Sequence, residues 1–193
     1  IQKYDTNTNF INLLQPRTVL DLYAGENSYY LRLSEELNYL NENPIKKLTT
    51  NDIKKEYSCN NYNLDALRLL CKLYYEHEKY DLIDLDPFGS AYSCFDLAIK
   101  MAKKGLIITY GEYGHKRWKR YDFLQRHYDI NNEEQFEVDM FINETQKKAY
   151  QNKKELEVIY IKQWANVLRV YYKINNLKLD IWNKEVIKEE VNG

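Results

Sequence analysis

Residues 80–90, YDLIDLDPFGS, decide the fold class of this chain. The first six form a short apolar run, which is typical of a buried strand. Pro87 and Gly89 end that run with a tight turn, and residues 90–103 then follow a helical pattern. A buried strand, a turn and a helix in this order form the repeating unit of a parallel α/β sheet.

The same alternation extends through the first half of the chain. Predicted strands occupy residues 18–22, 48–51, 80–85 and 105–110, and predicted helices occupy residues 28–40, 63–78 and 90–103. Asn63 is the expected N-cap of the second helix, and Gly105 is expected to end the third. This alternation predicts an α/β fold, a doubly wound domain with a mostly parallel, Rossmann-like sheet.

The second half of the chain has a different pattern. A basic helix is expected over residues 117–128 and a polar helix over residues 144–154. Strand-like runs at residues 157–161 and 166–172 are expected to add a C-terminal antiparallel hairpin to the edge of the sheet. No repeat or Pro/Gly/Ser-rich linker divides the sequence, so residues 1–193 are interpreted as a single domain.

Composition narrows the classes of partner and compartment. Lys and Arg (28) nearly cancel Asp and Glu (29), so a nucleic-acid partner requires a local basic patch. Cys59, Cys71 and Cys94 form no C-x-x-C pair, which disfavours a disulfide scaffold or a structural zinc site and favours a reducing, cytoplasmic compartment. No apolar run approaches the ~18 residues of a membrane span, so no membrane partner is expected.

Acidic residues recur where the predicted strands end. Asp21 ends the first strand, and Asp52 follows the second, 31 residues later. Asp84 and Asp86 end the third, with Asp86 lying 34 residues after Asp52. Ligands of such sheets bind beyond the carboxyl ends of the strands, where a carboxylate can accept hydrogen bonds from both ribose hydroxyls. The alternative is that these acids only cap helices and fill loops.

The loop after the first strand, residues 24–28 (AGENS), discriminates between nucleotide ligands. Gly25 permits a tight turn, but the loop lacks the G-x-G-x-x-G of a dinucleotide site, and the sequence contains no Gly-Lys-Ser/Thr P-loop. Glu26 adds a negative charge that disfavours a pyrophosphate. The loop therefore suits a cationic or zwitterionic ligand such as S-adenosylmethionine.

The turn at residues 86–90 is the most specific local signal. Pro87 keeps Asp86 out of the α conformation, and Gly89 permits the next turn. The loop is expected to be rigid and to present a carboxylate, Asp86, and an aromatic ring, Phe88. Methylation of an exocyclic amine needs such a pair, because the acceptor aligns the amine and the ring stacks on the base. The alternative is a turn that only closes the strand.

Five stretches resemble the class I S-adenosylmethionine-dependent methyltransferases. They are LDLYAGENS (20–28), TTNDI (49–53), NLDALRLL (63–70), DLIDLDPFGSAYSCFDLAI (81–99) and GLIITYGE (105–112). Within that class, DLDPFGS at residues 84–90 is similar to the D-x-D-P-F-G-S hallmark of the tRNA guanine N2-dimethyltransferase family. The resemblance covers about residues 17–110. Ala91 stands where that family usually has proline, and the chain is shorter than those enzymes.

The resemblance implies a methyltransferase-like domain that uses S-adenosyl-L-methionine and no metal. It places the first acid and its loop beside the methionine part of the cofactor, Asp52 at the ribose, and Asp65 with Ala66 near the adenine amine. The expected cofactor-binding residues are Asp21, Ala24, Gly25, Asp52, Asp65, Ala66 and Asp84, the last from its place on the same rim. The expected catalytic residues are Asp86, Pro87 and Phe88.

A concentrated positive patch follows the 105–110 strand. Its expected nucleic-acid-binding residues are Lys116, Arg117, Trp118, Lys119 and Arg120. The cations can neutralise phosphates and the indole can stack on an unpaired base. The alternative is a solvated helix face with Trp118 turned inward. His115 and His127 are too isolated to ligate a metal, and Trp164 and Trp182 are expected to be core or interface anchors.

These observations predict an S-adenosylmethionine-dependent methyltransferase that acts on an exocyclic amine of a nucleic-acid base. The DPFGS resemblance favours RNA over DNA, and guanine N2 of tRNA in particular. Three alternatives stay open: a DNA amino-methyltransferase, a small-molecule or protein methyltransferase, and a non-catalytic nucleic-acid-binding module on the same fold. The sequence leaves open the base, the number of methyl groups, the oligomeric state and the role of residues 136–193.

Overall fold

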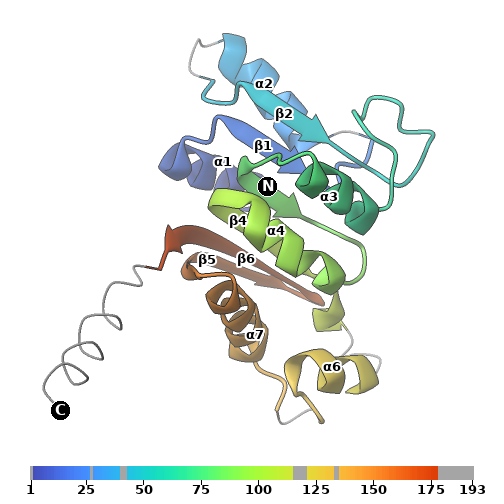
Figure 1. Ribbon diagram of the computed structural model, residues 1–193, viewed down its shortest axis with the longest axis vertical. Helices are drawn as coiled ribbons and strands as arrows, with labels where there is room; N and C mark the ends of the chain where they lie inside the picture. The colour runs from blue at the N-terminus through green and yellow to red at the C-terminus, as the bar shows by residue number, and fades with distance from the viewer. Residues whose placement is uncertain (1, 27, 40–42, 115–120, 133–134, 178–193) are drawn as a thin grey trace, which may run out of the picture.

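Six strands form one sheet in the order β2-β1-β3-β4-β6-β5 in a computed structural model of the chain (Figure 1). The structure describes residues 2–26, 28–39, 43–114, 121–132 and 135–177. The strands are β1 (Thr18–Asp21), β2 (Lys47–Thr50), β3 (Tyr80–Leu85), β4 (Ala102–Tyr110), β5 (Lys154–Trp164) and β6 (Val167–Asn176). The helices are α1 (Gln2–Leu14), α2 (Tyr29–Tyr39), α3 (Ala66–Tyr75), α4 (Phe95–Met101), α6 (Tyr121–Tyr128) and α7 (Val138–Gln151), with 3-10 turns η1 (Tyr92–Cys94) and η2 (Gly111–Gly114).

The strand directions confirm the predicted topology. β2, β1, β3 and β4 run parallel to one another, and their connections contain the helices α2, α3 and α4. β6 pairs antiparallel with β4, and β5 pairs antiparallel with β6 at the edge. The domain is therefore a doubly wound, mostly parallel α/β sheet with a C-terminal antiparallel hairpin.

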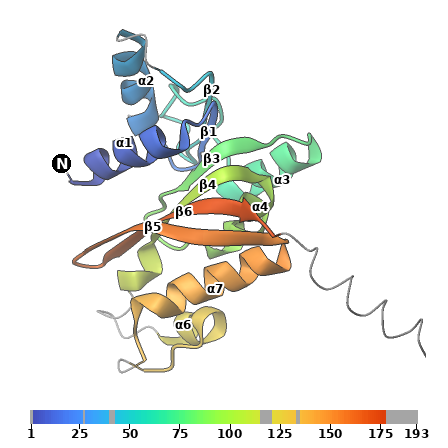
Figure 2. The same cartoon turned by 90° about the vertical axis from the view of Figure 1, so that its left-hand side faces the viewer.

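Successive strand residues point to opposite faces of the sheet, and each face packs against its own helices. Val19, Leu82 and Ile107 join a core cluster with residues of α1 and α2. Their neighbours, such as Leu20 and Ile83, join a larger cluster with residues of α3, α4 and α7. Figure 2 shows the sheet between these two helical layers.

Helix α1 is absent from the sequence prediction. Its buried residue Phe10 packs edge-on against Tyr171 of β6, with ring centroids 5.4 Å apart. Gly105 lies in β4 beneath this helix, and a Cβ atom there would lie 2.3 Å from Leu14 Cδ1. The predicted helix-ending role of Gly105 is therefore wrong: this glycine allows α1 to approach the sheet.

Helix boundaries differ from the predicted ones in several places. The N-cap of α3 is Asp65, which accepts from the amide of Arg68 at 3.0 Å, and not Asn63. Asn63 instead donates to the carbonyl of Lys54 at 2.9 Å. Helix α4 is shorter than predicted and α7 begins earlier, whereas residues 117–120 of the predicted basic helix lie outside the described residues. No helix in the described ranges is long and apolar enough to cross a membrane.

We expect Phe10→Ala to lower the free energy of unfolding by about 3–5 kcal/mol, because a buried aromatic ring is removed from a packed core. Leu13→Ala on the same helix is the matched control, since 54% of Leu13 is exposed. It is expected to change stability by less than about 1 kcal/mol. Chemical denaturation measures both values, and equal losses would contradict the position of α1 on the sheet.

Candidate active site

A cavity of about 1190 Å³ lies at the carboxyl ends of the parallel strands. It is found where the chain order reverses, because β1 has β2 on one side and β3 on the other. The loops after β1, β2, β3 and β4, the start of α3 and the β5–β6 turn all contribute to its wall. Eight predicted site residues line it: Ala24, Gly25, Asp52, Asp65, Ala66, Asp86, Pro87 and Phe88.

The loop after β1 is held against the loop after β2. Gly25 has a φ of 65°, a left-handed conformation that favours glycine, and its amide donates to Asp52 Oδ2 at 3.1 Å. Asp52 Oδ1 accepts from the amide of Lys54 at 2.9 Å. Asp52 is thus oriented by two backbone amides, and each carboxylate oxygen retains a lone pair for a ligand hydroxyl.

Asn51 links the loop after β1 to the end of the β2–α3 connection, a role that the sequence patterns do not indicate. Its Nδ2 donates to the carbonyls of Leu22 at 3.1 Å and Leu64 at 3.0 Å, and its Oδ1 accepts from the amide of Leu64 at 3.1 Å. The side chain is buried. Leu22 follows β1 and Leu64 precedes α3, so this single amide sets the spacing of these two segments of the cavity wall.

The loop after β3 projects its aromatic ring into solvent at the cavity. Phe88 is fully exposed, and Asp86 is partly exposed beside it. Behind them, a Cβ atom on Gly111 would lie 2.1 Å from the carbonyl oxygen of Gly89. The loop therefore rests directly on the backbone that follows β4.

A buried acid, Glu112, holds the far end of the same loop. Ser90 Oγ donates to Glu112 Oε1 at 3.1 Å and accepts from the amide of Tyr92 at 3.0 Å. The hydroxyl of Tyr128 donates to the same oxygen of Glu112. Burial raises the pKa of Glu112 above its usual range. The loop after β3 is thus fixed at its start by the strand and at its end by Glu112.

Arg169 of β6 is a central residue that the sequence patterns do not reveal. Its side chain is buried, and its Nη2 lies 2.6 Å from Asp84 Oδ2. Tyr30 also donates to Asp84 Oδ2, at 2.6 Å. Burial lowers the pKa of Arg169, but the charges of Asp84 and Asp86 outweigh this and raise it well above its usual range. Asp84 therefore holds the arginine inside the sheet and does not line the cavity.

Asp21, at the end of β1, also lies behind the cavity wall rather than on it. Its carboxylate accepts from Ser28 Oγ at 2.7 Å. Burial, and then the negative charges of Asp84 and Asp86, raise the pKa of Asp21 to about 7, although the Ser28 hydrogen bond opposes this. Asp21, Asp84 and Asp86, three of the acids predicted at the strand ends, therefore lie close together. Of these three, Asp86 lines the cavity.

Of the tryptophan, histidine and basic residues named in the sequence analysis, the structure describes Trp164 and His127. Trp164, predicted as a core or interface anchor, is 42% exposed and lines the cavity from the end of β5, so it is not a core residue, and its role as an interface anchor stays a prediction. His127 packs between Tyr92 and Phe123, with ring centroids 4.2 and 4.3 Å away. Outside the described residues lie His115, Trp182 and the predicted nucleic-acid-binding residues Lys116, Arg117, Trp118, Lys119 and Arg120.

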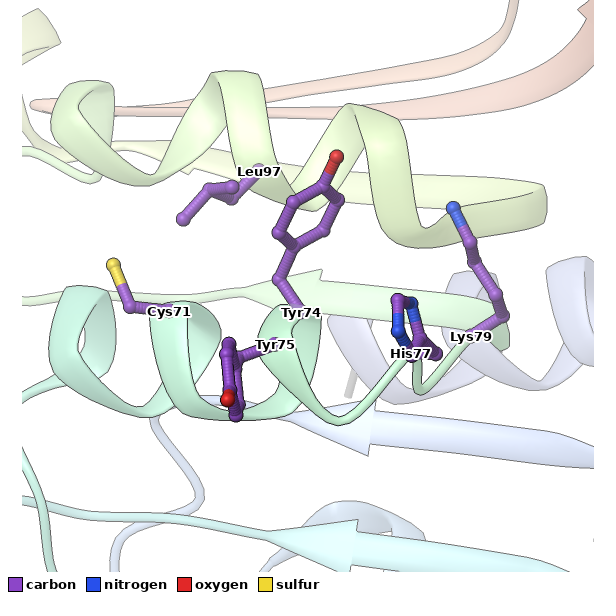
Figure 3. A pocket seen from close by; sticks show the side chains of 6 residues that line it. All are labelled: Cys71, Tyr74, Tyr75, His77, Lys79 and Leu97. Carbon is purple, nitrogen blue, oxygen red and sulfur yellow. The ribbon is translucent and has the colours of Figure 1, made fainter.

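A second cavity, of about 700 Å³, lies between α3 and α4 (Figure 3). Tyr74 projects from α3 toward α4, Leu97 lines the cavity from α4, and His77 and Lys79 line it from the segment that leads into β3. It contains none of the predicted site residues. The cavity at the carboxyl ends of the strands is therefore the candidate active site.

Solved methyltransferases have the same fold. Trm1 from Pyrococcus horikoshii, solved with S-adenosyl-L-methionine, matches with a TM-score of 0.74 at 19% identity, over 91% of this chain and 54% of that one. An O-methyltransferase from Bacillus cereus matches with a TM-score of 0.53 at 10% identity, over 89% of this chain and 80% of that one. For magnesium protoporphyrin IX methyltransferase from Synechocystis PCC 6803 the TM-score is 0.57 at 14% identity, over 90% and 81%.

The chain therefore has the fold of the class I S-adenosylmethionine-dependent methyltransferases. It spans about half the length of the Pyrococcus horikoshii protein. Residues 32–188 match the model of the N2,N2-dimethylguanosine tRNA methyltransferase family, and the chain belongs to this family. The resemblance predicted from residues 84–90 is thus confirmed. A comparison with curated protein sequences gives no match.

The raised pKa of Asp21 makes stability depend on pH. The folded protein binds this proton more tightly than the unfolded chain, where aspartate ionises near pH ~4. Ionising Asp21 therefore costs stability increasingly as pH rises from about 4 to about 7. We expect the stability of Asp21→Asn relative to wild type to increase over this interval.

Denaturant unfolding at about pH 5 and about pH 8 measures this difference. Asp122→Asn, at an exposed position on α6, controls for the loss of one negative charge. If the free energy of unfolding of Asp21→Asn differs from that of wild type by the same amount at both pH values, the raised pKa of Asp21 is contradicted.

Proposed function

We propose that this chain contains the catalytic part of an enzyme that transfers methyl groups from S-adenosylmethionine to the exocyclic amine of guanine in tRNA. The observation that carries the proposal is that one cavity combines the Asp52 loop with the Asp86 and Phe88 loop. Family membership supports the choice of guanine N2. We also propose a cytoplasmic location, since the free thiols of Cys59, Cys71 and Cys94 suit a reducing compartment.

The residues of the cavity fit this cofactor. The cavity has a volume of about 1190 Å³, which can hold a nucleoside cofactor together with a flipped base. Asp52 would accept the ribose hydroxyls, and the Gly25 turn lets the backbone approach the methionine part. Asp65 caps α3 through Oδ1, so its other oxygen can accept from the adenine amine. The bound cofactor would supply a methyl group whose bond to sulfur breaks as a bond to the amine nitrogen forms.

Asp86 would act on the amine that receives the methyl group. As a carboxylate it would accept a hydrogen bond from the amine, which directs the nitrogen lone pair toward the methyl carbon. The nitrogen gains positive charge as the new bond forms and then loses one proton. Asp86 would stabilise that charge and accept the proton. Its partial exposure at the cavity gives it access to the substrate.

Two exposed aromatic residues support a base as the substrate. Phe88 comes from the loop after β3, and Trp164 comes from the end of β5, so the cavity receives rings from two separate elements. Aromatic faces that are left in solvent can stack on a base taken out of its helix. The basic residues 116–120 remain the predicted phosphate-binding segment.

Transfer of a labelled methyl group to tRNA, ribosomal RNA and unmethylated DNA, measured in parallel, tests the proposed reaction. We expect transfer to tRNA, with dimethylated guanosine as the product. Asp86→Ala is expected to bind S-adenosylmethionine in calorimetry but to lose at least ~100-fold in transfer rate, because the acceptor for the amine is removed. Asp139→Asn, exposed on α7, is the control for a lost carboxylate.

Wild-type activity in Asp86→Ala would refute this mechanism. Transfer only to DNA would replace the RNA substrate with DNA. Cofactor binding without transfer to any nucleic acid would favour the small-molecule or protein alternative, and absence of cofactor binding would favour a non-catalytic module.

The stacking role of the aromatic pair has its own test. Phe88→Ala and Trp164→Ala are each expected to raise KM for tRNA by about 5- to 150-fold, which corresponds to one lost base stack. Cofactor affinity is expected to stay the same. Ile161→Ala is the matched control for Trp164, because Ile161 is an exposed residue of the same strand that does not line the cavity. An unchanged KM in both aromatic variants would exclude stacking.

A further inference from the structure

Arg169 connects a carboxylate inside the sheet to the carboxylate at the cavity. Its Nη2 lies 2.6 Å from Asp84 Oδ2, and its Nη1 lies 3.3 Å from Asp86 Oδ1. The two acids differ in their surroundings, because 4% of the Asp84 side chain and 27% of the Asp86 side chain are exposed. One guanidinium therefore spans from the core to the wall of the active site.

The remaining contacts fix the orientation of this guanidinium. Nη1 donates to Thr109 Oγ1 at 2.5 Å, and Nε donates to the Tyr171 hydroxyl at 3.1 Å. Nη2 has a further contact with Asn7 Oδ1 at 3.4 Å. Because all three nitrogens are engaged, the edge that faces Asp86 cannot rotate freely. This geometry is specific to arginine, since a single ammonium group cannot span both carboxylates.

Acidic groups outnumber the cation around Arg169. Asp21, Asp84 and Asp86 approach it from β1, β3 and the loop after β3, and Arg169 is the cation that ion-pairs with Asp84 and Asp86. The other titratable groups that face it, Tyr30 and Tyr171, remain neutral, because burial raises the pKa of each phenol. Without the guanidinium, Asp86 would face the like charges of Asp21 and Asp84 without the positive charge of Arg169 to offset them.

We propose that Arg169 is a positioning residue for methyl transfer, which orients Asp86 toward the substrate amine and keeps it ionised. The proposal rests on the proposed function, because Asp86 needs orientation and charge only if it accepts from that amine. Arg169 acts through Asp86 and not on the reacting atoms. Asp84 serves as the fixed anchor that keeps the arginine in place.

Steady-state kinetics of Arg169→Lys and Arg169→Met test the proposal. We expect kcat per cofactor-binding site to fall by about 10- to 100-fold in both variants, because the acceptor is no longer held in place. The Kd for S-adenosylmethionine is expected to change by less than ~3-fold. In Arg169→Met the acidic limb of the pH–kcat profile is expected to move upward by about one to three pH units. Arg169→Lys keeps the buried charge, so it serves as the test if Arg169→Met fails to fold.

Tyr171→Phe is the matched control for a purely structural role. It removes a contact on the Nε side of the guanidinium but none to Asp86. We expect it to lower stability without moving the acidic limb. If the Arg169 variants lose stability but keep the wild-type kcat and acidic limb, the arginine is only structural and the proposal is overturned.

A measurement without turnover separates this proposal from the proposed function. The carboxyl carbon of Asp86, observed by NMR in 13C-aspartate-labelled protein and assigned with Asp86→Asn, is expected to titrate at higher pH in Arg169→Met or Arg169→Lys than in wild type. An unchanged titration overturns the role of Arg169 even if wild type is fully active. A wild-type protein that transfers no methyl group overturns the proposed function, whatever the titration shows.

Discussion

A positive charge removed from water needs a partner, and the buried guanidinium of Arg169 imposes this condition on the centre of the sheet. Removing one member of a buried ion pair typically costs about 3–5 kcal/mol. Asp84 supplies the partner, and Tyr30 of α2 and Asn7 of α1 extend the network to both helices that cover that face. The sheet and the two helices on that face are therefore joined by polar contacts as well as by apolar packing.

Most of the sheet could be predicted, because buried parallel strands are short apolar runs that end at acids or turns. The loop at residues 86–90 could also be predicted, since proline and glycine restrict its backbone locally. Arg169 could not. In the sequence it is one cation in a strand-like run, and its partners Thr109 and Asp84 lie 60 and 85 positions away. A single sequence contains no pairing information over such distances.

Other differences arise because a local signal fits more than one role. Asn63 and Asp65 are both good N-cap residues, and the choice depends on the carbonyl groups that Asn63 contacts elsewhere. Gly105 has the properties of a helix terminator, yet its position is explained by the close approach of Leu14. Trp164 has a large apolar side chain, which favours a core position in a sequence analysis. The geometry of the β5–β6 hairpin instead brings it to the cavity.

The late position of β6 in the chain has a consequence for biosynthesis. A ribosome that adds about 5–20 residues per second needs roughly 4–17 s to proceed from Asp84 to Arg169. During that time the nascent chain contains the acids at the strand ends without their counter-ion, and β4, once made, is an open edge available to other strands. Docking of the β5–β6 hairpin on β4 ends this interval, because it covers the open edge and brings Arg169 to the acids in one step.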